Sequence, residues 1–420
     1  MRTSFNLVIS LLLIIEIFPH FPHAGEKCAL GELVFYDTSN SQIPRTYIRT
    51  INTDDSGRVW AGSVEGGLGV FNGNTWNVLT KENSGLPSNN ITKIAFDHKN
   101  NTWIGTDSGL IKHDGTTWTV YTPENSFLKG LYIRAIAFDR NDNIWCNDGG
   151  NGANVLMFSP GNEGGKSFVP ENPGYFLCTM MDILIDSSNT AWVGLFPCGL
   201  ARIEGDSCKV FNRDNSIMVY DWVDKLELDK EGMIWVGQSI GASSEIDAGG
   251  LLSVTHDAKH WKHNSPSQTG KASNNIGPIA CDKRGYLWVS THGSFPIKHD
   301  VVSIFNKKQW ISFTINNDAT ARPYYITDIA VDKHNNVWFA TLDGCILLLK
   351  QDTSAIDSLF AKEGVGVKHE FRLIPKQKRE MLYHDVLGRK SPIKGDDVKK
   401  ANGVLIGSDN IKTKKIVTVK

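Results

Sequence analysis

The chain has 420 residues, of which 40% are apolar, so it can bury a sizeable core and is longer than one ordinary domain. It carries 44 Lys and Arg against 45 Asp and Glu. This balance gives no overall attraction to nucleic acid or to an anionic membrane, and we expect neither as a partner.

The first 24 residues have the pattern of a secretory signal peptide. Arg2 gives a positive start, residues 7–15 are apolar, and Ala24 is a small residue suited to cleavage. Glu16 interrupts the apolar run and leaves it too short for a membrane anchor. We therefore predict export to the extracellular space or the outer-membrane surface, with no transmembrane segment after signal removal.

An Asp-x5-Trp frame then recurs seven times. Its copies are Asp54/Trp60, Asp97/Trp103, Asp139/Trp145, Asp186/Trp192, Asp229/Trp235, Asp282/Trp288 and Asp332/Trp338. Three residues before each Trp lies a residue type that tolerates positive φ: Gly57, Asn100, Asp142, Asn189, Gly232, Gly285 or Asn335. Each frame therefore predicts a strand, a tight turn whose N–H groups bind the Asp, and a second strand opened by a buried Trp.

The repeat spacing predicts an all-β, seven-bladed β-propeller over residues 25–351, because successive Trp residues are 42 to 53 residues apart. In the second repeat we expect strands at residues 91–96, 102–105, 110–113 and 118–121. An outer-strand pattern also precedes the first frame at residues 34–36, whereas the last repeat ends after residues 346–349. The N-terminal strand should thus close the last blade and cover two sheet edges.

The second repeat contains Ile-Thr-Lys-Ile-Ala-Phe-Asp-x5-Trp-Ile-Gly-Thr-x3-Gly-Leu, ending at Leu110. It resembles the two-component regulator propeller repeat, and the likeness extends over about residues 33–350. In the hybrid sensors of that family the propeller lies outside the cell, ahead of a transmembrane helix and a kinase. This sequence has neither feature, so the resemblance implies the fold and not signalling activity.

The charge balance shifts near the C-terminus, where residues 365–420 hold 14 basic against 6 acidic side chains and residues 1–364 hold 30 against 39. Residues 352–364 read as a linker. Residues 381–389, 401–404 and 414–420 resemble the C-terminal sorting domain of type IX secretion cargo, although His384 and Leu405 depart from its pattern. The resemblance implies a small β domain over 365–420 with the type IX machinery as partner. A solvated, lysine-rich β tail is the alternative.

Cysteine and histidine patterns give no reason to assign a metal or cofactor. Seven Cys remain after residue 24 without a Cys-x2-Cys pair, and most should be buried thiols. Export permits one bridge among Cys178, Cys198 and Cys208. His256, His260 and His263 fall in a predicted hairpin and read as solvated surface rather than as a metal site.

The repeated Asp and Trp residues are best explained by the fold, so function should lie where the repeats differ. Seven residues before each Asp, where the chain enters the innermost strand, the sequence reads Tyr47, Asn90, Tyr132, Thr179, Trp222, Asn275 and Tyr325. Aromatic faces beside amides suit a sugar ring and its hydroxyls. The alternative is that these rings pack between blades.

Charged residues occupy the positions five and four before the repeat Asp. They are Arg49, Lys93 and Arg134 in the first three repeats, and Asp182, Asp224, Lys225 and Asp328 in later ones. Buried charges need water or partners, so we expect them to line a hydrated channel, basic on one arc and acidic on the other. Ion pairing across the channel is the alternative. Longer connections at residues 147–154, 238–249 and 291–300 should lie on the same face.

These patterns predict an extracellular binding or scaffolding module, with glycans as a candidate ligand class. A propeller lyase or hydrolase is a second reading, because two of Asp182, Asp224 and Asp328 would supply an acid/base pair. An extracellular protein-interaction platform is a third. No His-Glu-x-x-His motif occurs, and no catalytic residue is assigned.

Overall fold

The computed structural model describes residues 26–44, 46–147, 154–160, 164–168, 178–239, 250–264, 275–291, 301–315 and 325–362, and five short strands between residues 371 and 418. The predicted signal peptide lies outside these residues. The chain divides into two compact units, residues 1–374 and 375–420. In the part of the chain so described, no helix is both long and apolar enough to cross a membrane.

The first unit is a ring of seven sheets, which we number as blades 1 to 7. Blade 1 contains β3 (Ile48–Thr53), β4 (Val59–Ser63), β5 (Leu68–Phe71) and β6 (Trp76–Leu79). Blade 2 contains β7 (Ile91–Phe96), β8 (Thr102–Thr106), β9 (Leu110–His113) and β10 (Trp118–Tyr121). Blade 3 contains β11 (Ile136–Phe138), β12 (Ile144–Asn147), β13 (Val155–Phe158) and β14 (Gly165–Phe168). Blade 4 contains β15 (Thr179–Ile185), β16 (Ala191–Phe196), β17 (Gly199–Glu204) and β18 (Ser207–Phe211).

The remaining blades repeat this antiparallel order. Blade 5 contains β19 (Val223–Leu228), β20 (Ile234–Gln238), β21 (Gly250–Val254) and β22 (Trp261–His263). Blade 6 contains β23 (Ile276–Cys281), β24 (Leu287–Thr291), β25 (Val301–Phe305), β26 (Trp310–Ile315) and, added in parallel, β30 (Phe371–Leu373). Blade 7 contains β27 (Ile326–Val331), β28 (Val337–Thr341), β29 (Ile346–Gln351), β2 (Gly31–Tyr36) and β1 (Glu26–Cys28).

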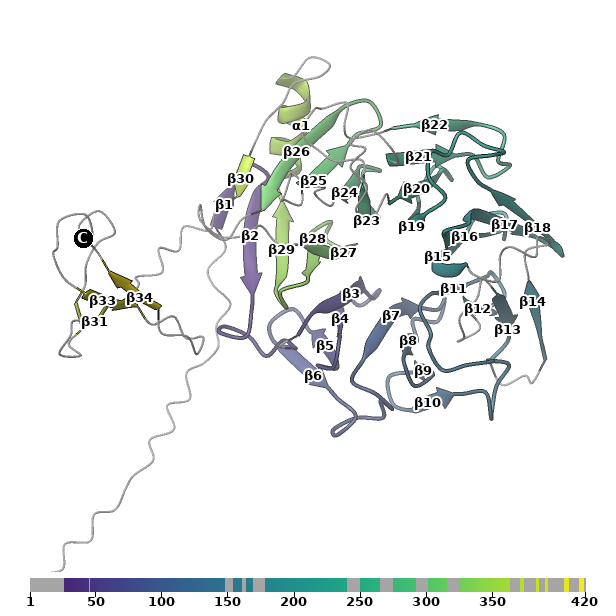
Figure 1. The fold of residues 1–420 in the computed structure, drawn as a ribbon, viewed down its shortest axis with the longest axis horizontal. Helices are drawn as coiled ribbons and strands as arrows, with labels where there is room; N and C mark the ends of the chain where they lie inside the picture. The colour runs from purple at the N-terminus through teal and green to yellow at the C-terminus, as the bar shows by residue number, and fades with distance from the viewer. Residues whose placement is uncertain are drawn as a thin grey trace, which may run out of the picture. The chain divides into compact units, whose positions relative to one another are not determined.

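The innermost strands β3, β7, β11, β15, β19, β23 and β27 contact one another in that order, and β27 returns to β3 (Figure 1). The prediction of a seven-bladed propeller is therefore confirmed. The ring closes as expected, because β2 pairs antiparallel with β29, with Leu33 opposite Leu349 and Tyr36 opposite Ile346. The N-terminal strand thus removes an exposed edge from blade 7.

The Asp-x5-Trp frame forms the same turn in all seven blades. Each Trp indole N–H donates to the Oδ2 of its own Asp at 2.9 to 3.4 Å. The other Asp oxygen accepts backbone N–H groups of the turn, as Asp97 does from Lys99 and Asn101. The third residue after each Asp has φ between 58° and 86°. Buried carboxylate and indole thus satisfy each other.

Neighbouring blades are linked through the same turns. The side-chain oxygen of Asn100 accepts the N–H of Asp55, and that of Asn335 accepts the N–H of Lys283. Where glycine replaces asparagine, this acceptor is lost. At Gly57 the Lys333 ammonium instead donates to the carbonyl of Ser56 at 2.5 Å.

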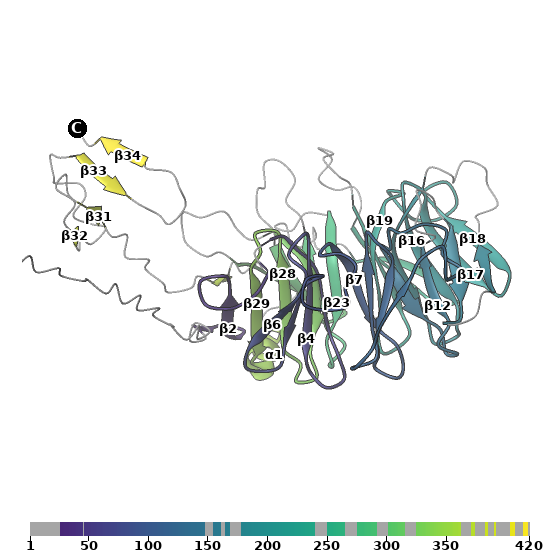
Figure 2. The same ribbon diagram turned by 90° about the horizontal axis from the view of Figure 1, so that it is seen from below.

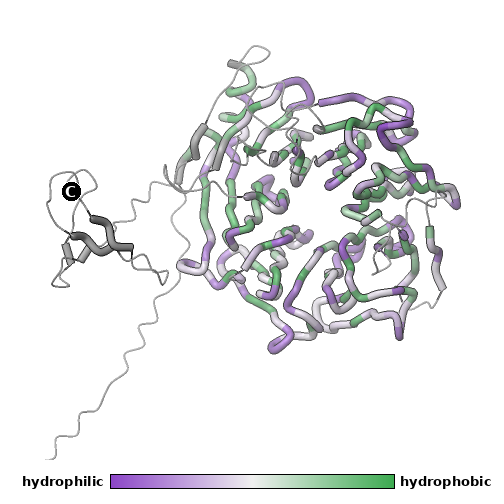
Figure 3. The backbone as a smooth tube through the Cα atoms, in the orientation of Figure 1, coloured by the Kyte–Doolittle hydropathy of each residue, from purple (hydrophilic) through white to green (hydrophobic). Residues whose placement is uncertain are grey.

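Apolar side chains fill the spaces between adjacent blades. Hydrophobic and hydrophilic segments alternate along the chain (Figure 3). Trp103, Trp192 and Trp288 are fully buried there. The frame Trp therefore contributes both a hydrogen bond and a large buried surface.

Part of the predicted linker is built into the propeller. Residues 353–362 form helix α1 (Thr353–Lys362), whose Ile356 and Phe360 are buried in the core between blades 6 and 7. Arg284 donates to Asp357 at 3.1 Å on the outside of this helix. With β30 paired to β26, the first unit extends to residue 374 rather than ending before the helix.

The second unit contains the sheet order β32-β31-β33-β34, formed by β31 (Tyr383–His384), β32 (Lys390–Ser391), β33 (Val404–Gly407) and β34 (Lys415–Thr418). All three pairings are antiparallel, and the strands are two to four residues long. A small C-terminal β unit was predicted.

Candidate functional site

The face on which the innermost strands begin is called the mouth face. Each innermost strand runs from this face to the opposite one, where the Asp-Trp turns lie (Figure 2). The second strand of the blade then returns, so its end lies beside the start of the first. Val64 N–H donates to the carbonyl of Tyr47, and Leu342 N–H to that of Tyr325.

Six of the seven innermost strands contain a bulge close to the mouth face. In blade 1, Ile48 pairs with Ser63 and Thr50 pairs with Gly62, so Arg49 is an extra residue. A bulge re-aims side chains that strict alternation would place on opposite faces. Here it lets two consecutive positions, five and four before the repeat Asp, face the channel.

A mouth cavity of about 350 Å³ lies at this level. The position five before the repeat Asp lines it in every blade: Arg49, Thr92, Arg134, Met181, Asp224, Gly277 and Thr327. Three tyrosines from the position two residues earlier also line it: Tyr47, Tyr132 and Tyr325. Lys93, Lys225 and Asp328 reach it from below. The structure therefore brings eight of the twelve sequence-predicted residues to one cavity.

The other four predicted residues lie elsewhere. Asn90 borders the rim, where its side chain donates to Asp107 at 3.0 Å and accepts a long contact of 3.4 Å from Arg49. Trp222 packs against Phe196 with ring centroids 4.3 Å apart and donates to Asp224 at 3.4 Å. Asn275 is buried and accepts from the Ser239 hydroxyl, so it links blades 5 and 6.

A deep cavity of about 270 Å³ continues the channel below the mouth, and the fourth of these residues, Asp182, lines it. Lys93, Lys225 and Asp328 line both cavities. The Lys93 ammonium lies 2.9 Å from Asp182, and that of Lys225 lies 3.4 Å from Asp328. Each pair connects blades two apart in the ring. The cross-channel ion pairing held as an alternative is therefore present for these four residues.

Both aspartates also bind backbone across a blade boundary. Asp182 Oδ2 accepts the Leu226 N–H at 3.2 Å, and Asp328 Oδ2 accepts the Ile51 N–H at 3.0 Å. Burial acts to raise the pKa of Asp182, but the ammonium groups of Lys93 and Lys225 outweigh it and hold that pKa below its usual value. Both carboxylates therefore link neighbouring blades through backbone N–H groups.

Glu227 was missed by the sequence analysis, although it lines the deep cavity. Its Oε1 accepts the N–H of Cys281 at 3.2 Å. Burial, reinforced by the nearby charges of Asp182 and Asp328, raises the pKa of Glu227 to about 8. The sequence did mark Glu227 in one way, because it is the charged residue at the position two before the repeat Asp. At that position the other blades have the uncharged residues Asn52, Ala95, Ala137, Leu184, Ala280 and Ala330.

The arginines of the mouth cavity have weaker partners than the lysines below. Arg49 donates to Asn90 at 3.4 Å and to the Tyr132 hydroxyl at 3.3 Å. Arg134 approaches the Met181 sulfur at 3.8 Å and lies over the Tyr132 ring at 5.5 Å. Among the described residues, neither guanidinium has a carboxylate within 4.0 Å.

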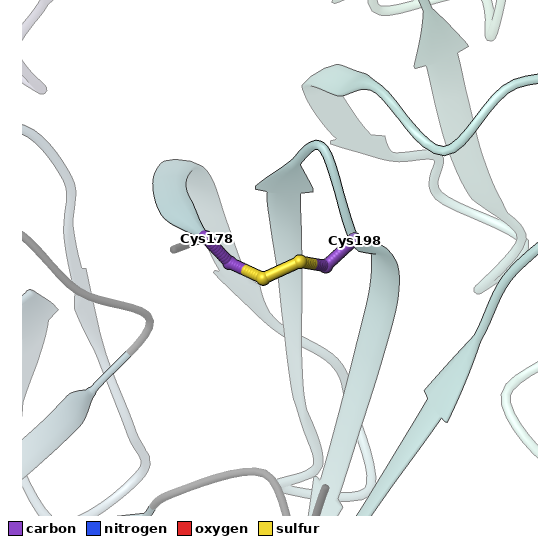
Figure 4. The surroundings of a disulfide bond; sticks show 2 residues. All are labelled: Cys178 and Cys198. Atoms are coloured by element: carbon purple, nitrogen blue, oxygen red, sulfur yellow. A yellow bond between two sulfur atoms is a disulfide. The ribbon is translucent and has the colours of Figure 1, made fainter. Parts of the chain in front are cut away.

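A disulfide joins Cys178 and Cys198 on the mouth face (Figure 4). It ties the start of β15 to the connection between β16 and β17, with the two Cα atoms 5.9 Å apart. The sequence analysis predicted that any disulfide would join two of the three cysteines of this blade. Cys208 is the cysteine that does not take part in the disulfide. Cys198 lies two residues after Phe196, the last residue of β16, against which Trp222 packs.

The remaining cysteines and the histidine cluster do not converge. Cys146 is buried, whereas Cys28, Cys208, Cys281 and Cys345 are only partly buried. His263 contacts the carbonyl of Ile217 at 2.9 Å. In the described part of the chain, no three His, Cys, Asp or Glu side chains are grouped as metal ligands would be.

Large apolar side chains are exposed around the mouth. The described residues of this kind are Leu131, Phe196, Ile217, Val219, Tyr325 and Leu342. Five of them belong to connections on the mouth face, either before an innermost strand or between the second and third strands of a blade, and Phe196 is the last residue of β16 at the same face. The mouth face is therefore more apolar at its rim than the opposite face.

Comparisons with known proteins agree with this architecture. Residues 85–108 match the family described as two component regulator propeller. Virginiamycin B lyase from Staphylococcus aureus is 13% identical with a TM-score of 0.57, over 76% of this chain and 98% of that one. The extracellular domain of the hybrid two component system BT3049 from B. thetaiotaomicron is 18% identical with a TM-score of 0.56, over 75% of this chain and 40% of that one.

A further propeller, YCF48 bound to D1 peptide, is 13% identical with a TM-score of 0.54, over 76% of this chain and 97% of that one. No curated protein matches this chain significantly. At these identities the likeness extends to the fold, and the chain is a β-propeller that contains a two-component regulator propeller repeat.

Proposed function

We propose that this propeller is an exported binding module that recognises a glycan at its channel mouth. The observation that carries this proposal is the mouth cavity itself, in which three tyrosines from blades 1, 3 and 7 share one space with guanidinium, ammonium and carboxylate groups. Tyr325 is 41% exposed, so its ring is open to a ligand. Aromatic faces beside hydrogen-bonding groups are what a sugar ring requires.

The structure favours binding over the lyase or hydrolase reading. An acid/base pair needs carboxyl groups that exchange protons with substrate. Asp182 and Asp328 are instead occupied by lysines and by backbone N–H groups. Product release from a polysaccharide panel, abolished by Asp224→Asn, would restore the catalytic reading.

Glycan binding is tested with Tyr325→Ala and Trp222→Ala on a glycan array, followed by titration of each hit. We expect at least a tenfold loss of affinity for Tyr325→Ala and a smaller loss for Trp222→Ala, which acts beside Asp224. Neither variant should unfold the protein. An array without hits, or two variants with unchanged affinity, would contradict the proposal.

Leu342→Ala is the matched control, because Leu342 lies beside Tyr325 and is 45% exposed. It also separates the proposal from a protein-interaction platform, which the apolar rim supports. A protein covering the rim would lose affinity with both variants, whereas a sugar at the mouth would lose affinity only with Tyr325→Ala.

Export by the type IX route is proposed from the resemblance of residues 365–420. The Cys178–Cys198 bond supports an oxidising destination, because disulfides persist there. Deletion of residues 375–420 should leave the propeller folded but retained in the cell envelope. Normal release of the truncated chain would contradict this route.

A further inference from the structure

Two of the seven residues at the position five before the repeat Asp have a structural role, and both are threonines. The Thr92 hydroxyl donates to the carbonyl of Ile133 in the next blade, and Thr327 donates in the same way to Ile48. Threonine here is therefore an inter-blade link. It occupies blades 2 and 7.

Blades 1 and 3 have arginine at this position and lack that link. Arg49 and Arg134 project instead over the mouth, against Tyr47 and Tyr132, with guanidinium carbons 5.8 and 5.5 Å from the ring centroids. Stacking of this kind holds the planar donors in place while leaving most of their N–H groups uncommitted. A structural explanation thus accounts for threonine but not for the two arginines.

Among the described residues, no carboxylate lies within 4.0 Å of either arginine. Lys93 and Lys225 are neutralised by Asp182 and Asp328, which leaves two guanidinium groups against Asp224 on blade 5. Asp224 lies near the Lys225 ammonium and accepts from the Trp222 indole N–H. Among the described residues that line this cavity, blades 1 and 3 contribute two guanidinium groups and two tyrosine rings but no carboxylate. The Asp107 carboxylate of blade 2 reaches Arg49 through the Asn90 side chain.

We infer that the mouth ligand is an acidic saccharide, whose carboxylate or sulfate group is held by Arg49 and Arg134 while a sugar ring lies on the tyrosines. The inference rests on the proposed function and narrows its ligand class. Guanidinium groups bind planar carboxylates and sulfates through paired N–H donors. An acidic peptide would satisfy the arginines but would not explain three tyrosines at one opening.

The test measures binding of matched neutral and acidic oligosaccharides, the latter bearing uronic acid or sulfate, by isothermal titration calorimetry. The full chain is compared with Arg49→Gln, Arg134→Gln and the conservative Arg49→Lys. We expect acidic ligands to bind at least tenfold more tightly, each Gln variant to lose at least tenfold, and the Lys variant to recover part of that loss. Affinity should fall as salt is raised.

Arg140→Gln is the control, because Arg140 is an exposed arginine of blade 3 in a turn on the opposite face. It removes the same charge without touching the mouth. An equal loss in this variant would reduce the effect to net charge and overturn the inference.

The outcomes separate the two proposals. Neutral and acidic saccharides that bind equally, with the Gln variants unaffected, would overturn the acidic ligand and leave glycan binding intact. If no saccharide binds, both the acidic ligand and glycan binding are overturned. Binding of a short acidic peptide through both arginines, with no saccharide bound, would replace the saccharide by a peptide.

Discussion

The deep cavity and the mouth cavity are built from consecutive positions of the same strands, yet they treat charge in opposite ways. In the deep cavity, Lys93 and Lys225 each reach an aspartate two blades away, and each aspartate also accepts a backbone N–H. At the mouth, the contacts of Arg49 and Arg134 within the described part of the chain are long and go to uncharged partners. Charges that hold the ring together are thus distinguished from charges available to a ligand by their partners, not by their type.

Removing a partner from the deep cavity should have the largest effect. Asp328→Ala leaves the Lys225 ammonium and the Ile51 N–H without their acceptor, so we expect a loss of about 3 to 5 kcal/mol in the free energy of unfolding. Urea unfolding measures it. The double variant Lys225→Met with Asp328→Leu should lose less than Asp328→Ala alone, because no unpaired charge is left. A loss below about 1 kcal/mol for Asp328→Ala would show that the ion pairs of the deep cavity do not stabilise the ring more than the arginines of the mouth do.

Glu227 in the deep cavity should make the stability of the protein depend on pH. Its pKa is about 8 in the folded protein against 4.5 in the unfolded chain, so the folded state keeps a proton that the unfolded state releases. The stabilisation from this proton is complete below pH 4.5 and is lost as the pH rises to 8.

Glu227→Gln keeps the acceptor for Cys281 but cannot ionise. At pH 9 we expect it to be more stable than the natural chain by about 2 to 3 kcal/mol, with little difference at pH 4.5. Denaturant unfolding at both pH values is the measurement. Asp182, Asp328, Lys93 and Cys281 face the same group and are unchanged in both chains. Parallel pH profiles for the two chains would show that Glu227 is solvated.

The smallest effect on stability is expected at the mouth. Arg49→Gln and Arg134→Gln remove no ion pair seen in the described residues, so each should change the free energy of unfolding by less than about 0.5 kcal/mol. The same urea experiment applies. A loss comparable to that of Asp328→Ala would assign the arginines to the scaffold and remove them from the binding site.

The repeat frame made the blades predictable from sequence because the Asp-Trp turn is local. Asp97 and Trp103 lie six residues apart and satisfy each other within one hairpin. Ring closure by β2 followed from the same pattern, since the outer strand at residues 34–36 lacked the rest of a blade.

The channel was less predictable because its contacts cross the ring. Lys93 pairs with Asp182 and not with a residue of the adjacent blade, whose corresponding position is the uncharged Ala135. Glu227 carried a signal only as an exception in a column of mostly apolar residues. Helix α1 was not predicted because it is only 10 residues long. Its apolar residues Ile356, Leu359 and Phe360 are too few to show a helical period in the sequence.

Pairing of β2 with β29 has a consequence for the order in which the chain becomes complete. Gly31 is among the first residues of the propeller to leave the ribosome, and its partner Gln351 is among the last. Contacts so distant in sequence form slowly, because nearly the whole ring must be enclosed in one loop first. Until then β2 lacks its partner strand. A chain exported during that interval would cross the membrane with its ring still open, and β2 would pair with β29 only after export.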